Sequence, residues 1–336
     1  MNIPKQLRNF SDRALLKNLE SGLEQVEAAL ELAVSHTDPI AKVTARHLSS
    51  AGGKRIRPAL VLLAAQLGNG INQQVIDSAV VVELTHLATL YHDDVMDEAP
   101  TRRGVATAHK IWGNSVAILT GDLLFARASQ VVSRLGERAL VLQADTFERL
   151  CLGQLHETVG PQANDNPLDH YIQVLADKTG SLIAAAAEMG VMFSGAPQEY
   201  REPLRVYGEN IGVAFQLMDD VIDINSDGAV SGKTPGTDLL AGVPTLPVLL
   251  LRAAANDATN PDAGSAALLD RIDSGLTEQT LPSVVAELRD SAALAQTHEH
   301  ARAWAQAAID ALAPLPDGSP KQALITFARA VVDRDA

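Results

Sequence analysis

Apolar residues recur at three- and four-residue spacing along most of the chain, as they do on the buried face of an α-helix. Sustained alternation of apolar and polar residues, which would indicate a half-buried strand, does not stand out anywhere in the sequence. Ser11 or Asp12 should cap the first helix. The pattern predicts an all-α fold with helices over residues 14–34, 57–68, 74–98, 115–136, 138–160, 168–195, 198–224 and 244–255.

Loops are expected where proline, glycine, asparagine and aspartate gather, at residues 161–167, 227–243 and 255–265. None of these segments is long or biased enough in composition to be an interdomain linker. We therefore expect residues 1–336 to form a single all-α domain that ends in a helical C-terminal extension.

Composition restricts the class of partner and the compartment. The net charge of −14 argues against nucleic acid, so an anionic substrate would need local Lys and Arg or metal ions. The one cysteine, Cys151, excludes an intramolecular disulfide and a cysteine metal cluster, and we expect it to be a small core residue. Because the sequence has no apolar run of about 18 residues and starts without a signal-peptide pattern, we expect no membrane span and a cytoplasmic location.

Two acidic motifs have the same spacing, and each follows an apolar helical stretch. The first holds Asp93, Asp94 and Asp97. The second holds Asp219, Asp220 and Asp223. Residues four apart share a helix face, where unpaired like charges repel and need a counter-charge. Mg²⁺ suits such sites, since it typically takes one or two carboxylates and completes its shell with waters and substrate phosphates; Mn²⁺ is a possible substitute.

Two other readings of these aspartates remain. Either cluster alone could be a solvated acidic face. The segment that starts at Asp223 also begins like a calcium-binding EF-hand loop, but its twelfth position is Thr234 where a bidentate glutamate is needed. The repeat of the spacing favours two metal-binding motifs.

Basic residues gather in short groups between the acidic motifs. Glycines and a helix start flank Lys54, Arg55 and Arg57, which together favour an anion site. The other groups are Arg102 with Arg103, Lys178 with Thr179, and Lys233. In a chain of negative net charge, cations placed among metal-type motifs indicate diphosphate substrates.

The chain resembles the trans-isoprenyl diphosphate synthases, the polyprenyl synthetase family. The matching motifs lie in family order over residues of about 50–252: "GGKRIRP", the first aspartate motif with "TRRG", "GD", "KTG", "FQLMDDVID" and "TLPVLL". The resemblance implies an all-α bundle around a deep central cavity, usually a homodimer. It also implies the head-to-tail condensation of an allylic diphosphate primer with isopentenyl diphosphate, with release of pyrophosphate.

The resemblance assigns a role to each motif. Asp93, Asp97 and Asp219 would bind the metal ions that neutralise the leaving diphosphate, and Asp94, Asp220 and Asp223 would complete the metal shells. Arg102, Lys178 and Lys233 would bind the allylic diphosphate, while Thr179 and Gln216 would direct oxygen dipoles at the carbocation. The isopentenyl diphosphate site would be formed by Lys54, Arg57, His86 and Arg103. The chain departs from the family pattern at Thr237, where many relatives have Lys or Ser, and at Val243–Pro244, where a basic residue is usual.

Product length should depend on the residues one turn and more before Asp93. Thr89 and Ala88 are small where short-chain relatives have bulky aromatics, and Leu84 and Val81 follow on the same face. At one isoprene unit per helical turn, this face predicts products of about thirty carbons or more, reaching the forties if the far end opens at a dimer interface. Such chains suit a quinone side chain, and a lipophilic product could favour transient membrane contact.

The sequence leaves three alternatives to a long-chain synthase. The first is a geranylgeranyl diphosphate synthase with a twenty-carbon product. The second is a class I terpene cyclase, which usually has a different second motif. The third is a regulatory subunit of a heteromeric synthase, and such subunits tend to lose the aspartates or the isopentenyl diphosphate site.

Overall fold

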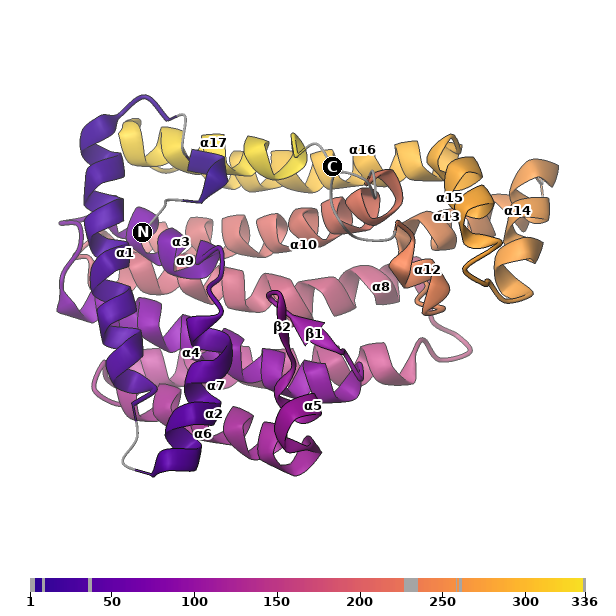
Figure 1. The fold of residues 1–336 in the computed structure, drawn as a ribbon. Coiled ribbons are helices and arrows are strands. Elements are labelled where there is room, and N and C mark those ends of the chain that lie inside the picture. The colour runs from indigo at the N-terminus through magenta and orange to yellow at the C-terminus, as the bar shows by residue number, and fades with distance from the viewer. Residues whose placement is uncertain are drawn as a thin grey trace. The chain divides into compact units, whose positions relative to one another are not determined.

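The computed structural model describes residues 4–7, 10–35, 38–226, 235–257, 259 and 262–334. These residues are almost entirely helical, which confirms the all-α prediction (Figure 1). The α-helices are α1 Arg13–Ala33, α2 Pro39–Ser50, α3 Ile56–Ala65, α4 Gln73–Met96, α5 Ala108–Trp112, α6 Asn114–Val132, α7 Glu137–Val159, α8 Pro167–Leu175, α9 Ser181–Phe193, α10 Arg201–Asn225, α12 Thr237–Leu240, α13 Leu246–Ala255, α14 Ala263–Asp273, α15 Leu281–Arg289, α16 Ala292–Ala311 and α17 Ser319–Val332.

The chain divides into two compact units. The first unit comprises Met1–Arg149, Ser181–Gly208 and Ala311–Phe327. The second unit comprises Leu150–Gly180, Glu209–Asp310 and Ala328–Ala336. Helices α7, α10, α16 and α17 contribute residues to both. The expectation of a single domain over the whole chain stays a prediction.

Helix α4 forms the centre of the first unit. It packs against α6, α3, α9 and α1, and its residues from Val75 to Ala88 are buried with the exception of Asp77 and His86. The nearly continuous apolar sequence of this segment explains its burial, because a helix that is hydrophobic on all sides must be covered on all sides. At the crossing of α9 with α3, Gly190 permits close approach, since a Cβ there would collide with the carbonyl of Val61.

Helix starts follow the capping rules read from sequence. The Asp12 side chain accepts hydrogen bonds of 3.0 Å from the backbone N–H groups of Ala14 and Leu15, so Asp12 and not Ser11 caps α1. Asp38 caps α2 in the same way, with Pro39 in the first turn. The apolar spacing did not predict α2. It was also wrong in starting the helix at 244, because α13 begins at Leu246 with Thr245 as its cap.

A two-stranded hairpin follows α4. Strand β1 (Thr101–Arg102) pairs antiparallel with β2 (Val105–Ala106). The turn residues Arg103 and Gly104 both have positive φ, of 54° and 79°, which is the backbone of a tight hairpin turn. The hairpin turns the chain back towards the end of α4 and thereby sets the position of Arg102.

The predicted helix over 168–195 is interrupted in the structure. It consists of α8, a π-helical turn over Ala176–Gly180, and α9. The widened turn contains the "KTG" motif, and π-turns within helices frequently mark functional sites. Within the second unit Gly180 lies against α10, where a Cβ on Gly212 would collide with the backbone of Gly180.

Two further predictions concern the burial of Cys151 and the presence of a membrane-spanning helix. Cys151 is exposed, which contradicts the prediction of a core residue: it lies on the outer face of α7 with Leu152 and Leu155. Among the described helices, α6 alone is long and apolar enough to cross a bilayer, judged by length and composition only. A single such helix is weak evidence, because core helices of globular proteins pass the same test.

Candidate active site

The first acidic motif occupies the last turn of α4 in the first unit. Asp93 is half-buried, and Asp97 is exposed at the C-cap of the helix, where its N–H donates to the Asp93 carbonyl at 2.8 Å. Being four residues apart, Asp93 and Asp97 share one face of the helix. They are the two carboxylates of this motif that face outward.

Asp94 points the other way. It is fully buried, and its Oδ1 accepts a hydrogen bond of 2.6 Å from Nε of Arg102. Burial raises the pKa of Asp94, and the neighbouring Arg102 opposes that shift. Within the described residues its Oδ2 is buried and has no hydrogen-bond partner. In this structure Asp94 therefore holds Arg102, and its predicted role in a metal shell stays a prediction.

A cluster of cations surrounds one buried glutamate of α4. Arg55, one of the cations expected to form an anion site, is buried, and its backbone has a positive φ of 47°. Its Nη1 donates to Glu83 Oε1 at 2.7 Å, and it also pairs with Glu27. Arg103 lies 3.9 Å from the same Glu83 oxygen and donates to the Leu48 carbonyl at 2.9 Å. Glu83 thus positions two of the cations.

Gly53 lies close to two guanidinium groups of this cluster. A Cβ on Gly53 would lie 3.0 Å from Cζ of Arg103 and 3.1 Å from Nη1 of Arg55. The absence of a side chain at Gly53 therefore lets both guanidinium groups approach the loop backbone.

The predicted isopentenyl diphosphate residues come together around this cluster. Burial holds the pKa of His86 well below its ordinary value, reinforced by the charges of Arg57 and Arg103. Burial also lowers the pKa of Arg57 to about 10, with Glu83 opposing and Arg103 adding to the shift. Lys54 is exposed on the preceding loop. His86 should therefore be neutral at pH 7, and anion binding here should rest on the arginines.

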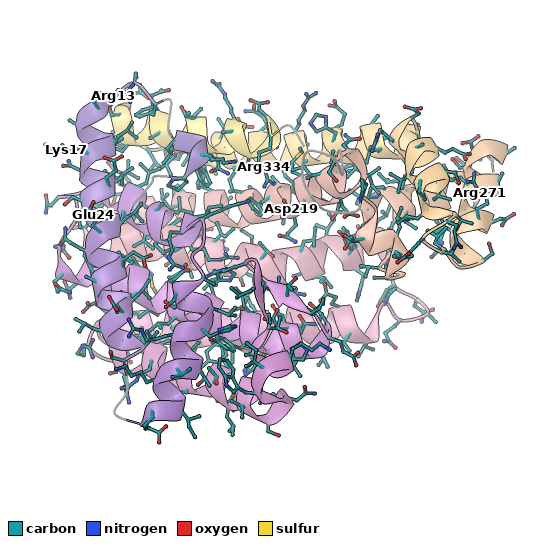
Figure 2. All side chains as sticks on the ribbon, in the orientation of Figure 1. Arg13, Lys17, Glu24, Asp219, Arg271 and Arg334 are labelled. Atoms are coloured by element: carbon teal, nitrogen blue, oxygen red, sulfur yellow. The ribbon has the colours of Figure 1, made fainter. Side chains whose placement is uncertain are left out.

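The second acidic motif lies on α10 in the second unit, and each of its aspartates has a different environment. Asp219 is part-exposed and lies 3.1 Å from Nη2 of Arg334 (Figure 2). The same guanidinium donates to the Phe215 carbonyl at 3.0 Å and stacks 4.1 Å from the centre of the Phe215 ring. The C-terminal end of the described chain is thereby fixed against the motif.

Asp220 is buried and anchors neighbouring elements. It accepts hydrogen bonds from Tyr171 Oη at 2.7 Å and from the Leu246 N–H at 3.2 Å, at the start of α13. Burial raises the pKa of Asp220 to about 7, and these two hydrogen bonds oppose the shift. As with Asp94, the middle aspartate of the motif faces inward.

Asp223 caps the short helix α12. Its Oδ1 accepts from the Thr237 hydroxyl at 2.7 Å, and its Oδ2 accepts from the Asp238 N–H at 3.3 Å. Thr237, which departs from the family pattern, is therefore a direct partner of a motif aspartate. The metal roles of Asp220 and Asp223 stay predictions.

The remaining residues of the allylic diphosphate site lie in the second unit. Lys178, in the π-turn, forms an ion pair with Glu157 of α7. Thr179 is buried beside it, and Gln216 is half-buried one turn before Asp219 and Asp220 on α10. Lys233 lies outside the described residues. The predicted roles of these residues in binding the allylic diphosphate stay predictions.

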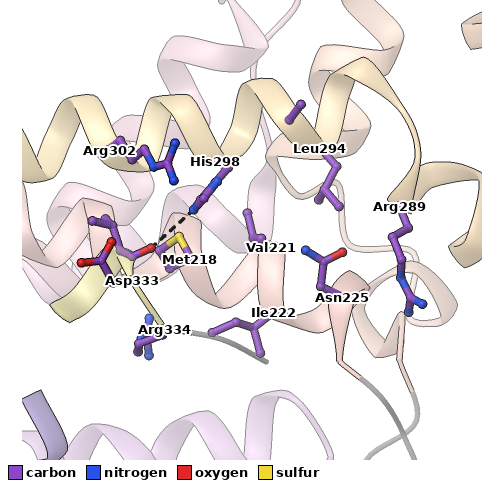
Figure 3. A pocket seen from close by; sticks show the side chains of 12 residues that line it. Met218, Val221, Ile222, Asn225, Arg289, Leu294, His298, Arg302, Asp333 and Arg334 are labelled. Atoms are coloured by element: carbon purple, nitrogen blue, oxygen red, sulfur yellow. Dashed lines mark hydrogen bonds between the residues drawn. The ribbon is translucent and has the colours of Figure 1, made fainter. Parts of the chain in front are cut away.

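A cavity of about 400 Å³ adjoins the second motif within the same unit. Met218, Val221, Ile222 and Asn225 of α10 line one wall, and His298 and Leu294 of α16 line another (Figure 3). Its remaining lining includes Arg289, Arg302, Asp333 and Arg334. None of the three motif aspartates is among the residues that line this cavity.

The carboxylates fit a metal that is shared with substrate. Among the described residues, no group of three or more His, Cys, Asp or Glu side chains is arranged to hold a metal ion. Each motif nevertheless presents an accessible carboxylate on a helix face: Asp93 with Asp97, and Asp219. Mg²⁺ is usually bound by one or two carboxylates together with substrate phosphates, which matches this donor set.

The residues predicted to control product length lie inside the first unit. Val81, Leu84 and Ala88 are buried on α4, and Thr89 is half-buried with its hydroxyl bonded to the His86 carbonyl at 2.8 Å. Val81, Leu84 and Ala88, which are three and four residues apart, share one side of α4. Their effect on product length stays a prediction.

Sequence reasoning missed Glu83 and Tyr171. A lone glutamate inside the apolar run "AVVVELTHLA" could have been recognised, since buried carboxylates are seldom tolerated without a cationic partner. Tyr171 gave no comparable indication, because its bond to Asp220 joins helices 49 residues apart.

Comparison with known proteins identifies the family. The polyprenyl synthetase family model matches residues 38–268. Nonaprenyl diphosphate synthase of Mycobacterium tuberculosis is 41% identical over 97% of this chain and 96% of its own length. The structure of geranylgeranyl pyrophosphate synthase from Corynebacterium glutamicum, complexed with calcium and isoprenyl diphosphate, is 40% identical, with a TM-score of 0.84 over 96% of this chain and 98% of its own.

A second solved structure is that of a decaprenyl diphosphate synthase from Rhodobacter capsulatus. It is 34% identical and has a TM-score of 0.84, covering 95% of this chain and 98% of its own. These similarities extend well beyond the motifs, over nearly the whole length of each protein. The chain belongs to the polyprenyl synthetase family, whose members are trans-prenyltransferases.

Proposed function

We propose that this chain is a long-chain all-trans polyprenyl diphosphate synthase. It joins an allylic diphosphate primer to isopentenyl diphosphate head to tail, repeatedly, and releases pyrophosphate at each step. The observation that supports the long product best is the pair of small residues, Ala88 and Thr89, that precede Asp93 by five and four positions. The nonaprenyl and decaprenyl relatives agree with that reading.

The family depends on divalent metal ions. We propose Mg²⁺, with Mn²⁺ as a substitute, held by Asp93, Asp97 and Asp219 together with the substrate diphosphate. When bound, such an ion supplies Lewis-acid stabilisation of the departing pyrophosphate. The calcium in the Corynebacterium glutamicum structure is a hard, oxygen-binding cation of the same kind.

The chain's own residues bind and orient the two substrates. Arg102, which pairs with Asp94, and Lys178, which pairs with Glu157, bind the allylic diphosphate. Arg57 and Arg103 bind isopentenyl diphosphate, and the Leu48 and Gly52 carbonyls hold the Arg103 side chain. The oxygens of Thr179 and Gln216 stabilise the allylic carbocation, and the departing pyrophosphate accepts the final proton.

The test is the product made by the pure protein. Incubation with a short allylic diphosphate, labelled isopentenyl diphosphate and Mg²⁺ should yield all-trans products of about thirty to forty-five carbons, by mass spectrometry. A product that stops at twenty carbons would favour the geranylgeranyl alternative. The absence of any elongation would favour a regulatory subunit, and cyclic hydrocarbon made without isopentenyl diphosphate would favour a terpene cyclase.

The two groups of cations should serve different substrates. Arg57→Ala should raise KM for isopentenyl diphosphate by about 10- to 100-fold, and Lys178→Ala should do so for the allylic primer, because a hydrogen bond to a charged group contributes roughly 1.5–3 kcal/mol. Initial-rate kinetics with each substrate varied in turn measures this. Lys17→Ala, on the exposed face of α1, is the matched control (Figure 2). If each variant raised only the other substrate's KM, the assignment of the two groups would be reversed.

We also propose that the chain forms a homodimer. Helix α6 exposes Ile118 and Leu119, and the first turns of α7 expose Leu140 and Val141. Each helix thus exposes two adjacent large apolar side chains, and exposed apolar patches mark interaction surfaces. Sedimentation equilibrium should therefore give twice the mass of one chain, whereas a particle of single-chain mass would contradict the proposal.

A further inference from the structure

Two buried side chains near the first acidic motif have polar atoms without hydrogen bonds. Oδ2 of Asp94 and both ring nitrogens of His109 are buried and, within the part of the chain that the structure describes, have no hydrogen-bond partner. Asp94 is 0% exposed and His109 is 8% exposed. Buried polar atoms normally find partners, so an unpaired carboxylate oxygen and an unpaired imidazole in one unit need an explanation.

The β-hairpin keeps His109 close to the end of α4. The backbone N–H of Ala99 donates to the Asp94 carbonyl at 3.1 Å, and the Thr107 hydroxyl donates to the Ala99 carbonyl at 2.7 Å. The Thr107 N–H also donates to the Pro100 carbonyl at 3.2 Å. Thr107 directly precedes α5, in which His109 is the second residue. These bonds therefore fix the start of α5 against the segment that follows Asp94.

The two unpaired groups are complementary in hydrogen bonding. A carboxylate oxygen accepts hydrogen bonds, and a neutral imidazole donates one from a ring N–H. Helix α5 also packs against α4. Burial raises the pKa of Asp94, whereas Arg102 and then His109 lower it, so the imidazole lies within electrostatic reach of the carboxylate.

Arg102 is the third member of this group. Its Nε donates to Oδ1 of Asp94 at 2.6 Å, and no other hydrogen bond or ion pair of its side chain is present among the described residues. The Arg102 side chain is 32% exposed, whereas that of Asp94 is 1% exposed. A guanidinium that turns towards an anionic ligand would leave Asp94 as a buried charge without a partner, which is strongly destabilising.

From these contacts we infer that His109 is a positioning residue for the binding of the allylic diphosphate. The inference rests on the proposed function, in which Arg102 binds that diphosphate. As the guanidinium turns from Asp94 towards the diphosphate, a ring N–H of His109 donates to the carboxylate. The buried carboxylate thus stays paired, and Arg102 shifts without leaving an uncompensated charge.

The first test measures the effect on each substrate separately. His109→Phe keeps an aromatic ring but removes both nitrogens, so KM for the allylic primer should rise by about tenfold, as expected for the loss of one hydrogen bond to a charged group. KM for isopentenyl diphosphate should stay unchanged. His109→Gln retains an N–H donor and should restore most of the affinity for the primer. A rise in both KM values, or no rescue by glutamine, would contradict the inference.

A double-mutant cycle tests whether His109 acts through Asp94. Asp94→Asn removes the buried negative charge, so adding His109→Phe to this variant should change the KM for the primer much less than in the wild type. Residues that act through one another show such non-additivity, whereas independent residues do not. Additive effects of the two substitutions would overturn the inference.

His47→Gln separates positioning from support of the hairpin. Nε2 of His47 donates to the Ala106 carbonyl at 2.7 Å, and its ring packs edge-on against Trp112 of α5, with ring centres 5.1 Å apart. His47 thus supports the same hairpin and helix without a hydrogen bond to Asp94. His47→Gln should lower the melting temperature and leave both KM values unchanged. A rise in the primer KM equal to that of His109→Phe would show that His109 only supports the fold.

A spectroscopic test uses the wild-type chain and so remains decisive if His109→Phe does not fold. The ring nitrogens of His109, assigned by ¹⁵N NMR with the help of His109→Gln, should change chemical shift when an unreactive allylic thiolodiphosphate and Mg²⁺ are added. The change should be absent in Asp94→Asn. Calorimetry with the same ligand shows whether it binds.

The outcomes separate this inference from the proposed function. If the thiolodiphosphate binds, Arg102→Ala weakens its binding and the His109 signals do not move, the inference is overturned while the proposed function stands. If the ligand does not bind, or Arg102→Ala leaves its affinity unchanged, the proposed role of Arg102 fails and the inference fails with it.

Discussion

Replacing Asp93 or Asp219 by alanine should lower turnover by several orders of magnitude, while circular dichroism shows unchanged helix content. Each is an accessible carboxylate of its motif, on α4 and α10 respectively. Removing it deletes a ligand for the metal that neutralises the leaving diphosphate, and electrostatic groups of this kind are commonly the largest single contribution to catalysis. The substitutions should not unfold the protein, because neither side chain is buried.

The measurement is the initial rate at saturating substrates, accompanied by calorimetric titration with Mn²⁺ in the presence of an unreactive diphosphate. Both variants should bind the metal more weakly, and chelator should abolish activity of the wild type until Mg²⁺ or Mn²⁺ is restored. Asp310→Ala, at an exposed position of α16, removes the same charge outside the motifs and is the control. Near-normal turnover in either motif variant would refute the metal-based mechanism.

Ala88→Phe should shorten the product from about thirty or more carbons to about fifteen or twenty, with the first condensations intact. Ala88 is fully buried one turn from Asp93, so a phenyl ring there occupies space along the proposed path of the product. Overpacking a core position typically costs about 1–3 kcal/mol of stability, so melting temperature should fall modestly. Mass spectrometry of the extracted products, after removal of the diphosphate, reads out the length.

Thr89→Phe provides a companion at a half-buried position that has more room. It should shorten the product in the same direction with less loss of stability. Leu32→Phe, on the exposed side of α1, adds the same ring elsewhere and should leave product length unchanged. An unaltered distribution in both Ala88→Phe and Thr89→Phe would mean that the product does not follow this face of α4.

Local patterns in the sequence were sufficient for the fold class and for the location of the motifs. Apolar spacing predicts α1, α4, α6, α7 and α10 to within a few residues, because helix periodicity is a property of the chain itself. The repeated aspartate spacing indicated diphosphate chemistry before any contact was known. The apolar spacing did not predict α2, because its apolar residues Ile40 and Val43 lie on the exposed face and so obscure the pattern of a buried face.

Only the tertiary structure determines which residues the buried aspartate of each motif contacts. The sequence "DDVMD" is almost the same as "DDVID", yet Asp94 holds Arg102 across a hairpin, while Asp220 holds Tyr171 and the start of α13. The exposure of Cys151 and the inward turn of Arg55 towards Glu83 were likewise decided by which helix covers which face.

The physical reason is the separation along the chain of the residues that interact. Helix formation, capping and the sharing of a face depend on residues within about four positions, so the sequence by itself determined most of the helices and the two acidic motifs. Hydrogen bonds such as Gln143 to Thr85 join residues 58 positions apart, and their existence depends on helix packing that no local pattern contains. The packing therefore decided which polar groups are paired and which are left unpaired.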